Sequence, residues 1–287
     1  MKKSKLRNAE ELFFRGVMII STSVIGFALF LILWSIIKRG LPALSWAMLT
    51  QTPKGGFYFG KEGGIANAIV GSLYLASGAT LLAMAIGIPV SLYMNVNLHR
   101  RKKLVNTIRF LLDVMWGIPS IVYGAFGFTL MIYFGMHSSL LAGIITVTLF
   151  IIPIMIRSID EVLLSVPNGL MEASYSLGST QSETSYKVFL RQCISGVITA
   201  ILLSFGRAIG DAASVLFTTG YTDHMPTSLM QPTATLPLAI FFQMSSPIAE
   251  VKERAYASAL ILTLIILFIS IIARIISTRY QKNKIKI

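Results

Sequence analysis

The stretch SSLLAGIITVTLFIIPIMI, residues 138–156, contains no charged side chain. A helix of about 20 mainly apolar residues is long enough to cross the hydrocarbon core of a bilayer. This stretch therefore predicts a membrane-spanning helix. Only Met136 and His137 separate it from another apolar stretch on its N-terminal side, which predicts a tight hairpin, and a long polar segment follows on its C-terminal side.

Six apolar stretches of this kind occur in a chain that is 54% hydrophobic and only 13% charged. They cover residues 16–37, 68–94, 114–135, 138–156, 194–220 and 255–273. The net charge of +13 does not indicate nucleic-acid binding, because the basic residues lie in clusters between apolar stretches too long for a soluble fold. We predict an all-α, polytopic membrane protein with six transmembrane helices.

The distribution of Lys and Arg predicts the orientation of the chain, because cytoplasmic segments of membrane proteins carry an excess of these residues. If the N-terminus is inside, 18 of the 25 Lys and Arg residues lie in inner segments and six lie in outer ones. The remaining one, Arg207, lies in the fifth span. We therefore expect both termini on the cytoplasmic side.

Neither a metal site nor an ATP site is expected. The sequence has one cysteine and three widely separated histidines, so it offers no metal-ligand spacing and no cofactor is predicted. The stretch GGFYFGKE, residues 55–62, begins like a phosphate-binding loop, but Glu62 stands where such a loop needs Ser or Thr. It also falls in an outer loop without access to ATP. We expect a transport subunit that does not hydrolyse ATP by itself, and not an enzyme.

The long inner segment SVPNGLMEASYSLGSTQSETSYKVFLRQ, residues 165–192, has the pattern of two helices separated by a glycine. Pro167 suits the first turn of a helix, and Gly178 ends that helix. Thr180 and Glu183 have the spacing of a capping box, which begins a second helix. Such an element is either a docking surface for another protein or an ordinary amphipathic connector.

The same segment resembles the EAA loop of ABC importer permeases, in which Glu172, Ala173 and Gly178 match the pattern E-A-A-x3-G. In that family the loop sits in a cleft of the cytoplasmic ATPase and passes its motion to the spans. The resemblance therefore implies that these three residues couple the chain to an ATPase. Two positions depart from the pattern: Ser174 replaces Ala, and Arg191 replaces Pro.

Four further stretches resemble the phosphate-transport permeases, and most of all their A-type (PstA-like) subunits. They are GGIANAIVGSLYL (63–75), GIPSIVYGAFGF (117–128), GRAIGDAASVLFTTG (206–220) and PTATLPLAIF (232–241). The resemblance implies a type I ABC importer permease fold. It divides the chain into residues 1–65 with the cytoplasmic tail, first span and first outer loop, a transport core at 66–275, and a basic tail at 276–287. The coupling loop occupies about residues 157–193 of the core.

The resemblance also implies the partners and the location. We expect a C-type permease subunit, a cytoplasmic ATPase dimer, an extracytoplasmic phosphate-binding protein and membrane lipid, with the chain in the cytoplasmic (inner) membrane. Two alternatives stay open. One is a permease for another oxyanion, such as molybdate, sulfate or phosphonate. The other is an ion-coupled carrier or channel that works without an ATPase.

The fifth span carries charge inside an apolar stretch. On one helix, positions spaced i, i+3, i+7, i+10 and i+14 share a face, which here predicts a polar stripe. Its members are Ser204, Arg207, Asp211, Ser214 and Thr218. Gly206 and Gly210 lie on a neighbouring face with the spacing that lets another helix pack closely.

A charge in the middle of a bilayer costs at least about 2.5 kcal/mol, so this stripe should face the interior of a bundle. Either Arg207 and Asp211 form an i,i+4 pair that only locks the bundle, or Arg207 contacts the transported anion while Asp211 orients it. The guanidinium fork suits phosphate oxygens, and a lock needs no hydroxyls. We therefore predict that the five stripe residues line the path of the solute.

Overall fold

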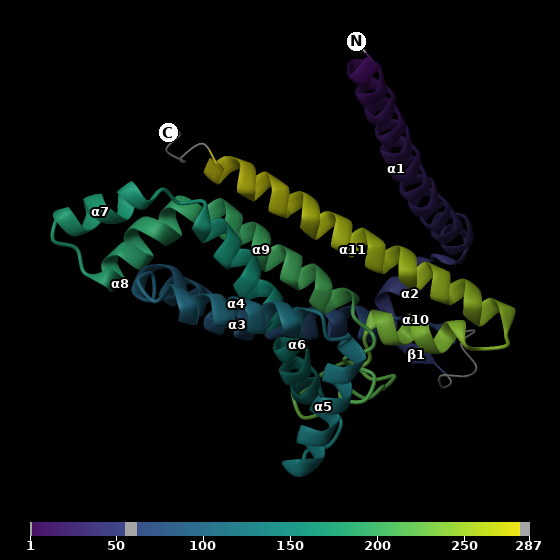
Figure 1. Ribbon diagram of the computed structural model, residues 1–287. Coiled ribbons are helices and arrows are strands. Elements are labelled where there is room, and N and C mark those ends of the chain that lie inside the picture. The colour runs from purple at the N-terminus through teal and green to yellow at the C-terminus, as the bar shows by residue number, and fades with distance from the viewer. Residues whose placement is uncertain (1, 55–61, 282–287) are drawn as a thin grey trace.

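The computed structural model describes residues 2–54 and 62–281, and Figure 1 shows the arrangement of its helices. Nearly all of the phosphate-loop-like stretch at 55–62 lies outside the described residues, as does the end of the predicted basic tail, 282–287. The described chain is almost entirely helical. A single short antiparallel pair joins β1 (Pro53–Lys54) to β2 (Glu62–Gly63) within it.

Most helices follow one another with short connections, and the longer connections lie between α2 and α3 (51–65) and between α9 and α10 (211–235). Their bounds are α1 Lys2–Ala43, α2 Trp46–Thr50, α3 Ala66–Leu92, α4 Lys102–Trp116, α5 Ser120–Tyr133, α6 Leu140–Leu164, α7 Asn168–Ser176, α8 Gln181–Glu183, α9 Leu190–Gly210, α10 Leu236–Met244 and α11 Ala249–Gln281. Two π-helical turns continue their neighbours: η1 (Tyr93–Asn97) follows α3, and η2 (Thr184–Phe189) joins α8 to α9.

The bundle is built around α6, which contacts α3, α4, α5 and α9. Ile151, Ile154 and Ile159 of α6 are completely buried. In the most apolar part of α6, 72% of the residues are buried, whereas none are buried in the corresponding part of α1. Figure 1 shows α7 and α8 at one end of the bundle and α2 and α10 at the other, while α1 contacts α11 and diverges from the rest.

The prediction of six spans is confirmed in number, with one change of form. Five helices are long and apolar enough to cross a membrane, and α4 with α5 makes up a sixth span that is bent by 94°. The predicted single helix at 114–135 is therefore wrong. Pro119 has no N–H to continue the helix and disfavours helical backbone at the residue before it, so α4 stops at Trp116 and α5 restarts at Ser120.

The predicted fifth span, 194–220, is wrong at both ends. Its helix already begins at Gln181, because α8, η2 and α9 are continuous, and it ends at Gly210. Asp211 has an extended backbone (φ −86°, ψ 123°), and its Oδ2 accepts a hydrogen bond from the backbone N–H of Ser214 at 2.8 Å. The carboxylate thus stabilises a turn that starts after the helix instead of continuing it.

The segment between α9 and α10, residues 211–235, folds back into the bundle. Thr218, Thr219 and Thr233 are completely buried, and the Thr233 N–H donates to the Thr219 carbonyl at 2.9 Å. A side chain at Gly71 of α3 would collide with the carbonyl oxygen of Ala234, so glycine permits this close approach. This connection is therefore partly a buried packing element.

Candidate anion path, coupling loop and buried arginine cluster

Arg207 lies on the last turn of α9 with an exposed side chain. Its guanidinium carbon lies 5.3 Å from the centre of the Phe150 ring of α6, which is a cation–π contact. The predicted i,i+4 ion pair with Asp211 is not formed among the described residues, because the helix ends before Asp211 and its carboxylate binds the turn at Ser214. The positive charge of Arg207 is therefore not neutralised by the aspartate that the sequence assigned to it.

The predicted polar stripe is also not continuous. Ser204, Ser214 and Thr218 are completely buried, whereas Arg207 is exposed. The Ser204 hydroxyl donates to the Ala200 carbonyl at 3.0 Å and the Thr218 hydroxyl donates to the Ser214 carbonyl at 3.5 Å. Within the described part of the chain the Ser214 hydroxyl has no partner. The five residues would share one face only if a single helix ran through 204–218. Because the helix ends before Asp211, they do not form a stripe.

A groove of about 630 Å³ between α9 and α11 surrounds Arg207. Its polar lining consists of two arginines and four hydroxyl side chains: Arg207, Arg274, Thr199, Ser270, Ser277 and Thr278. No carboxylate lines this groove among the described residues. The hydroxyls of Thr199, Ser277 and Thr278 donate to carbonyls of the chain, so the two arginines are the groups that suit an anion in this groove.

Sequence reasoning did not propose Arg274 as a site residue, because it lies just beyond the predicted sixth span, 255–273. It belongs to α11, and Ser270, Arg274 and Ser277 have the spacing i, i+4, i+7 of one helix face. That spacing was visible in the sequence and was the signal that would have found it.

Gly206 and Gly210 do not pack against another helix of this chain. A side-chain carbon placed on either glycine would meet no neighbouring group of the described residues within 4 Å. The close helix contact predicted for these glycines is therefore not made within the described residues.

The coupling loop has the local structure that its sequence predicts. Gly178 has a φ of +81°, which L-residues with side chains rarely adopt, and it follows the end of α7. Thr180 and Glu183 form both hydrogen bonds of a capping box. The predicted glycine break and helix start are confirmed, although the second helix is not separate and continues into α9.

The outward face of α7 is exposed. Glu172 and Ala173 are both exposed, and Leu177, just beyond the end of the helix, is 87% exposed. On the inward side the Ser174 and Thr184 hydroxyls lie 2.9 Å apart in a buried hydrogen bond. Ser174 therefore ties α7 to η2, which gives a physical reason for serine at a position where the EAA pattern has alanine.

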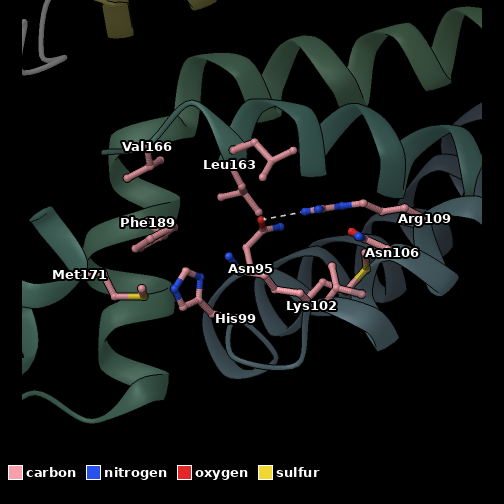
Figure 2. A pocket seen from close by; sticks show the side chains of 12 residues that line it. Asn95, His99, Lys102, Asn106, Arg109, Leu163, Val166, Met171 and Phe189 are labelled. Carbon is pink, nitrogen blue, oxygen red and sulfur yellow. Dashed lines mark hydrogen bonds between the residues drawn. The ribbon is translucent and has the colours of Figure 1, made fainter. Parts of the chain in front are cut away.

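A buried charged cluster lies where α6 approaches this loop. Asp160 is completely buried and accepts hydrogen bonds from Arg109 Nε at 2.8 Å and Nη2 at 2.9 Å, from Arg157 Nη1 at 2.7 Å and from Asn95 Nδ2 at 2.8 Å. Arg157 Nε also donates to Asp113 at 2.6 Å. The cluster joins η1, α4 and α6, and Figure 2 shows Asn95 and Arg109 connected by one of its hydrogen bonds.

Sequence reasoning did not find this cluster. Arg157 and Asp160 are three residues apart in an apolar helix, which was a local signal, but their pairing with Arg109 and Asn95 depends on packing between distant segments. A buried charge is costly unless it is paired and hydrogen-bonded. Asp160 therefore fixes the relative positions of three helical segments.

Residues 87–282 match the family described as the binding-protein-dependent transport system inner membrane component. The chain belongs to this family. The matched region contains α4 to α9, the coupling loop and the buried cluster, whereas α1 and α2 precede it. As an inner membrane component with several apolar helices, the chain is a multi-pass inner-membrane protein.

Curated relatives of this inner membrane component are similar over nearly the whole chain. The phosphate transport system permease protein PstA of Yersinia pestis is 35% identical over 266 residues, which cover 91% of this chain and 89% of the relative. PstA of Haemophilus influenzae is 33% identical and covers 91% of both chains. PstA of Pasteurella multocida is 35% identical and covers 88% of both. These relatives are named as permeases and not as enzymes.

Solved structures support the fold of the inner membrane component. An inward-facing form of the MetNI methionine ABC transporter matches 75% of this chain and 95% of its own, with a TM-score of 0.63 and 20% identity. An amino acid ABC transporter crystallised with histidines matches with a TM-score of 0.57 and 18% identity, over 75% of this chain and 93% of its own. The predicted type I ABC importer permease fold is therefore confirmed.

Proposed function

We propose that the chain is one of two permease subunits of an ATP-driven importer of inorganic phosphate. The observation that carries this proposal is the similarity to PstA proteins at 33–35% identity over about nine-tenths of the chain. The partners are a C-type phosphate permease, a cytoplasmic ATPase dimer and an extracytoplasmic phosphate-binding protein. Accumulation of an anion requires external work, because an inside-negative potential opposes each negative charge by about 2.3 kcal/mol per 100 mV.

The end of the bundle that carries α7 and α8 faces the cytoplasm, in accordance with the excess of Lys and Arg in the segments on that side. There Glu172, Ala173 and Leu177 present an exposed surface to the ATPase. A cysteine introduced at the exposed Ser182 should react with a membrane-impermeant thiol reagent only from the inside. Labelling in intact cells would contradict this orientation.

Phosphate passes the α9–α11 groove, in which Arg207 and Arg274 supply its cationic contacts. Arg207 offers a planar fork of donors, and its described surroundings leave it without a carboxylate partner. Asp211 stabilises the turn that follows Arg207, and the buried residues Ser204, Ser214 and Thr218 lie on α9 and in that turn without lining the groove. Gly206 and Gly210 receive a helix of the C-type subunit.

The test is uptake by the assembled complex in proteoliposomes, with ATP inside and the phosphate-binding protein and radiolabelled phosphate outside. ATP-dependent phosphate uptake that excess sulfate, molybdate and phosphonate do not reduce is the expected result. Selective competition by one of these anions would assign that anion as the solute. Uptake of phosphate in the absence of the ATPase would instead favour the alternative function, an ion-coupled carrier or channel.

A further inference from the structure

A second anion-accepting region lies away from the α9–α11 groove, at the end of the bundle that carries the coupling loop. It is a pocket of about 310 Å³ between η1, the start of α4, the end of α6 and the coupling loop, and Figure 2 shows its side chains. Its polar lining residues are Asn95, His99, Lys102, Asn106 and Arg109. Its apolar wall includes Met171 of α7 and Phe189 of η2.

Three of the five polar side chains that line this pocket have no hydrogen-bond partner in the described chain, whereas Asn95 and Arg109 belong to the buried cluster. Among the described residues, the side chains of His99, Lys102 and Asn106 take part in no hydrogen bond or ion pair. Arg109 uses Nε and Nη2 to hold Asp160 and Asn95, which leaves its Nη1 unused in the described chain. No carboxylate lines the pocket within this described region, and Asp160 behind it is already paired with both Arg109 and Arg157.

We propose that this pocket binds a phosphate group, which belongs either to free inorganic phosphate or to the headgroup of an anionic phospholipid. A tetrahedral phosphate has several acceptor oxygens and can take donors from Lys102, His99 and Arg109 at once. The adjoining run Arg100–Lys103 adds to the positive field around the opening.

A group bound in this pocket lies between α4 and the coupling loop. Met171 and Phe189 belong to the coupling loop, whereas Lys102 and Arg109 belong to α4. A bound phosphate group is therefore held by donors of α4 and the segment before it, and it lies beside the apolar wall that the coupling loop contributes. The proposal does not depend on which solute the complex imports, so failure of the uptake test leaves it standing.

Lys102→Gln tests the proposal, and Lys103→Gln is its matched control. Both lysines are exposed at the start of α4 and both changes remove one positive charge, but only Lys102 lines the pocket. His99→Gln is a second pocket variant. Loss of one charge-assisted hydrogen bond weakens binding by about tenfold. Each variant is purified in the complete complex with the partner permease and the ATPase, without the phosphate-binding protein.

The first measurement is equilibrium dialysis of radiolabelled inorganic phosphate against the complex in phosphatidylcholine nanodiscs. The expected result for the free-phosphate source is binding that is about tenfold weaker in Lys102→Gln and His99→Gln but unchanged in Lys103→Gln. If phosphate binding is lost in Arg207→Gln but kept in Lys102→Gln, free phosphate binds in the α9–α11 groove. That result would overturn free phosphate as the ligand of this pocket.

The second measurement is retention of phosphatidylglycerol by the complex in native mass spectrometry. Retention that falls about tenfold in Lys102→Gln and is unchanged in Lys103→Gln supports the lipid source. The proposal is overturned if Lys102→Gln and Lys103→Gln behave alike in both measurements, including the case in which neither probe binds.

Discussion

Arg109 and Arg157 surround a carboxylate that is completely buried, whereas Arg207 and Arg274 line a groove without a carboxylate in the described chain. In the first region nearly every hydrogen-bonding atom of Asp160 and its partners is used within the chain. In the second region Arg207 lies over the face of the Phe150 ring and forms no ion pair with the described residues. The difference separates charges that hold helices together from charges that remain free to meet a ligand.

Asp160→Asn should break the first region and have the largest effect on the amount of folded protein. The change leaves Arg109 and Arg157 without the buried negative charge, which costs about 3–5 kcal/mol. The yield of assembled complex and its melting temperature measure this loss. The control is Glu161→Gln, since Glu161 is 61% exposed and lies 3.5 Å from Arg157, so its loss costs at most about 1 kcal/mol. Equal yields for both variants would contradict the structural role of Asp160.

Arg207→Gln in the second region should have the opposite effect, because it should reduce transport and leave the folded protein intact. We expect normal assembly and normal basal ATP hydrolysis, with phosphate uptake reduced by about 10- to 100-fold through loss of a charge-assisted contact. Arg207→Lys should also lose most uptake, because an ammonium cannot reproduce the bidentate fork. Exchange of Arg207 and Asp211 is not informative, since the aspartate binds the turn at Ser214. Uptake near the wild-type level in Arg207→Gln would place the path elsewhere.

Gly178→Val sharpens the comparison, because it should reduce transport without touching either arginine region. A β-branched residue at a φ of +81° is strained by about 1–2 kcal/mol, which should distort the coupling loop. We expect weaker binding of the ATPase, and uptake and transport-coupled ATP hydrolysis that fall together severalfold. Gly169→Val is the control, since Gly169 has open space around it and no positive φ. Coupled uptake at the normal rate in Gly178→Val would remove the coupling role.

Ser174→Ala should have the smallest effect, about 1 kcal/mol or less, because the Thr184 hydroxyl still donates to the Thr180 carbonyl. Thr184→Val should cost more, since it leaves the buried Ser174 hydroxyl without its partner. Thermal unfolding of the complex compares the two. A larger loss in Ser174→Ala than in Thr184→Val would contradict this assignment.

Features set by local chemistry were predictable from the sequence. The capping box of Thr180 and Glu183 and the left-handed Gly178 depend on neighbouring residues alone. The end of α9 was also encoded locally, because a glycine followed by aspartate is a common signal to stop one element and start another. The long apolar run obscured it, and the predicted stripe extended past Asp211.

The arginine cluster and the groove depend on which helices pack together. Nothing near Arg109 in the sequence indicates that Asp160, 51 positions away, is its partner. The same holds for Arg207 and Arg274, which meet only because α9 and α11 are neighbours. Hydropathy identified the spans well, but it carries no information on which of their faces meet.

The 94° break between α4 and α5 divides one span into two mechanical links. The first link, α4, is bound to α6 through Arg109 and Asp113, whereas the second link, α5, packs through Gly124 against the backbone of Ala213 and Ser214. A straight helix would act as a rigid lever, so that movement at one membrane face would force movement at the other. With a joint at Gly117–Pro119, α4 can move with α6 while α5 keeps its contact with the segment after α9, so movement of one link need not force movement of the other.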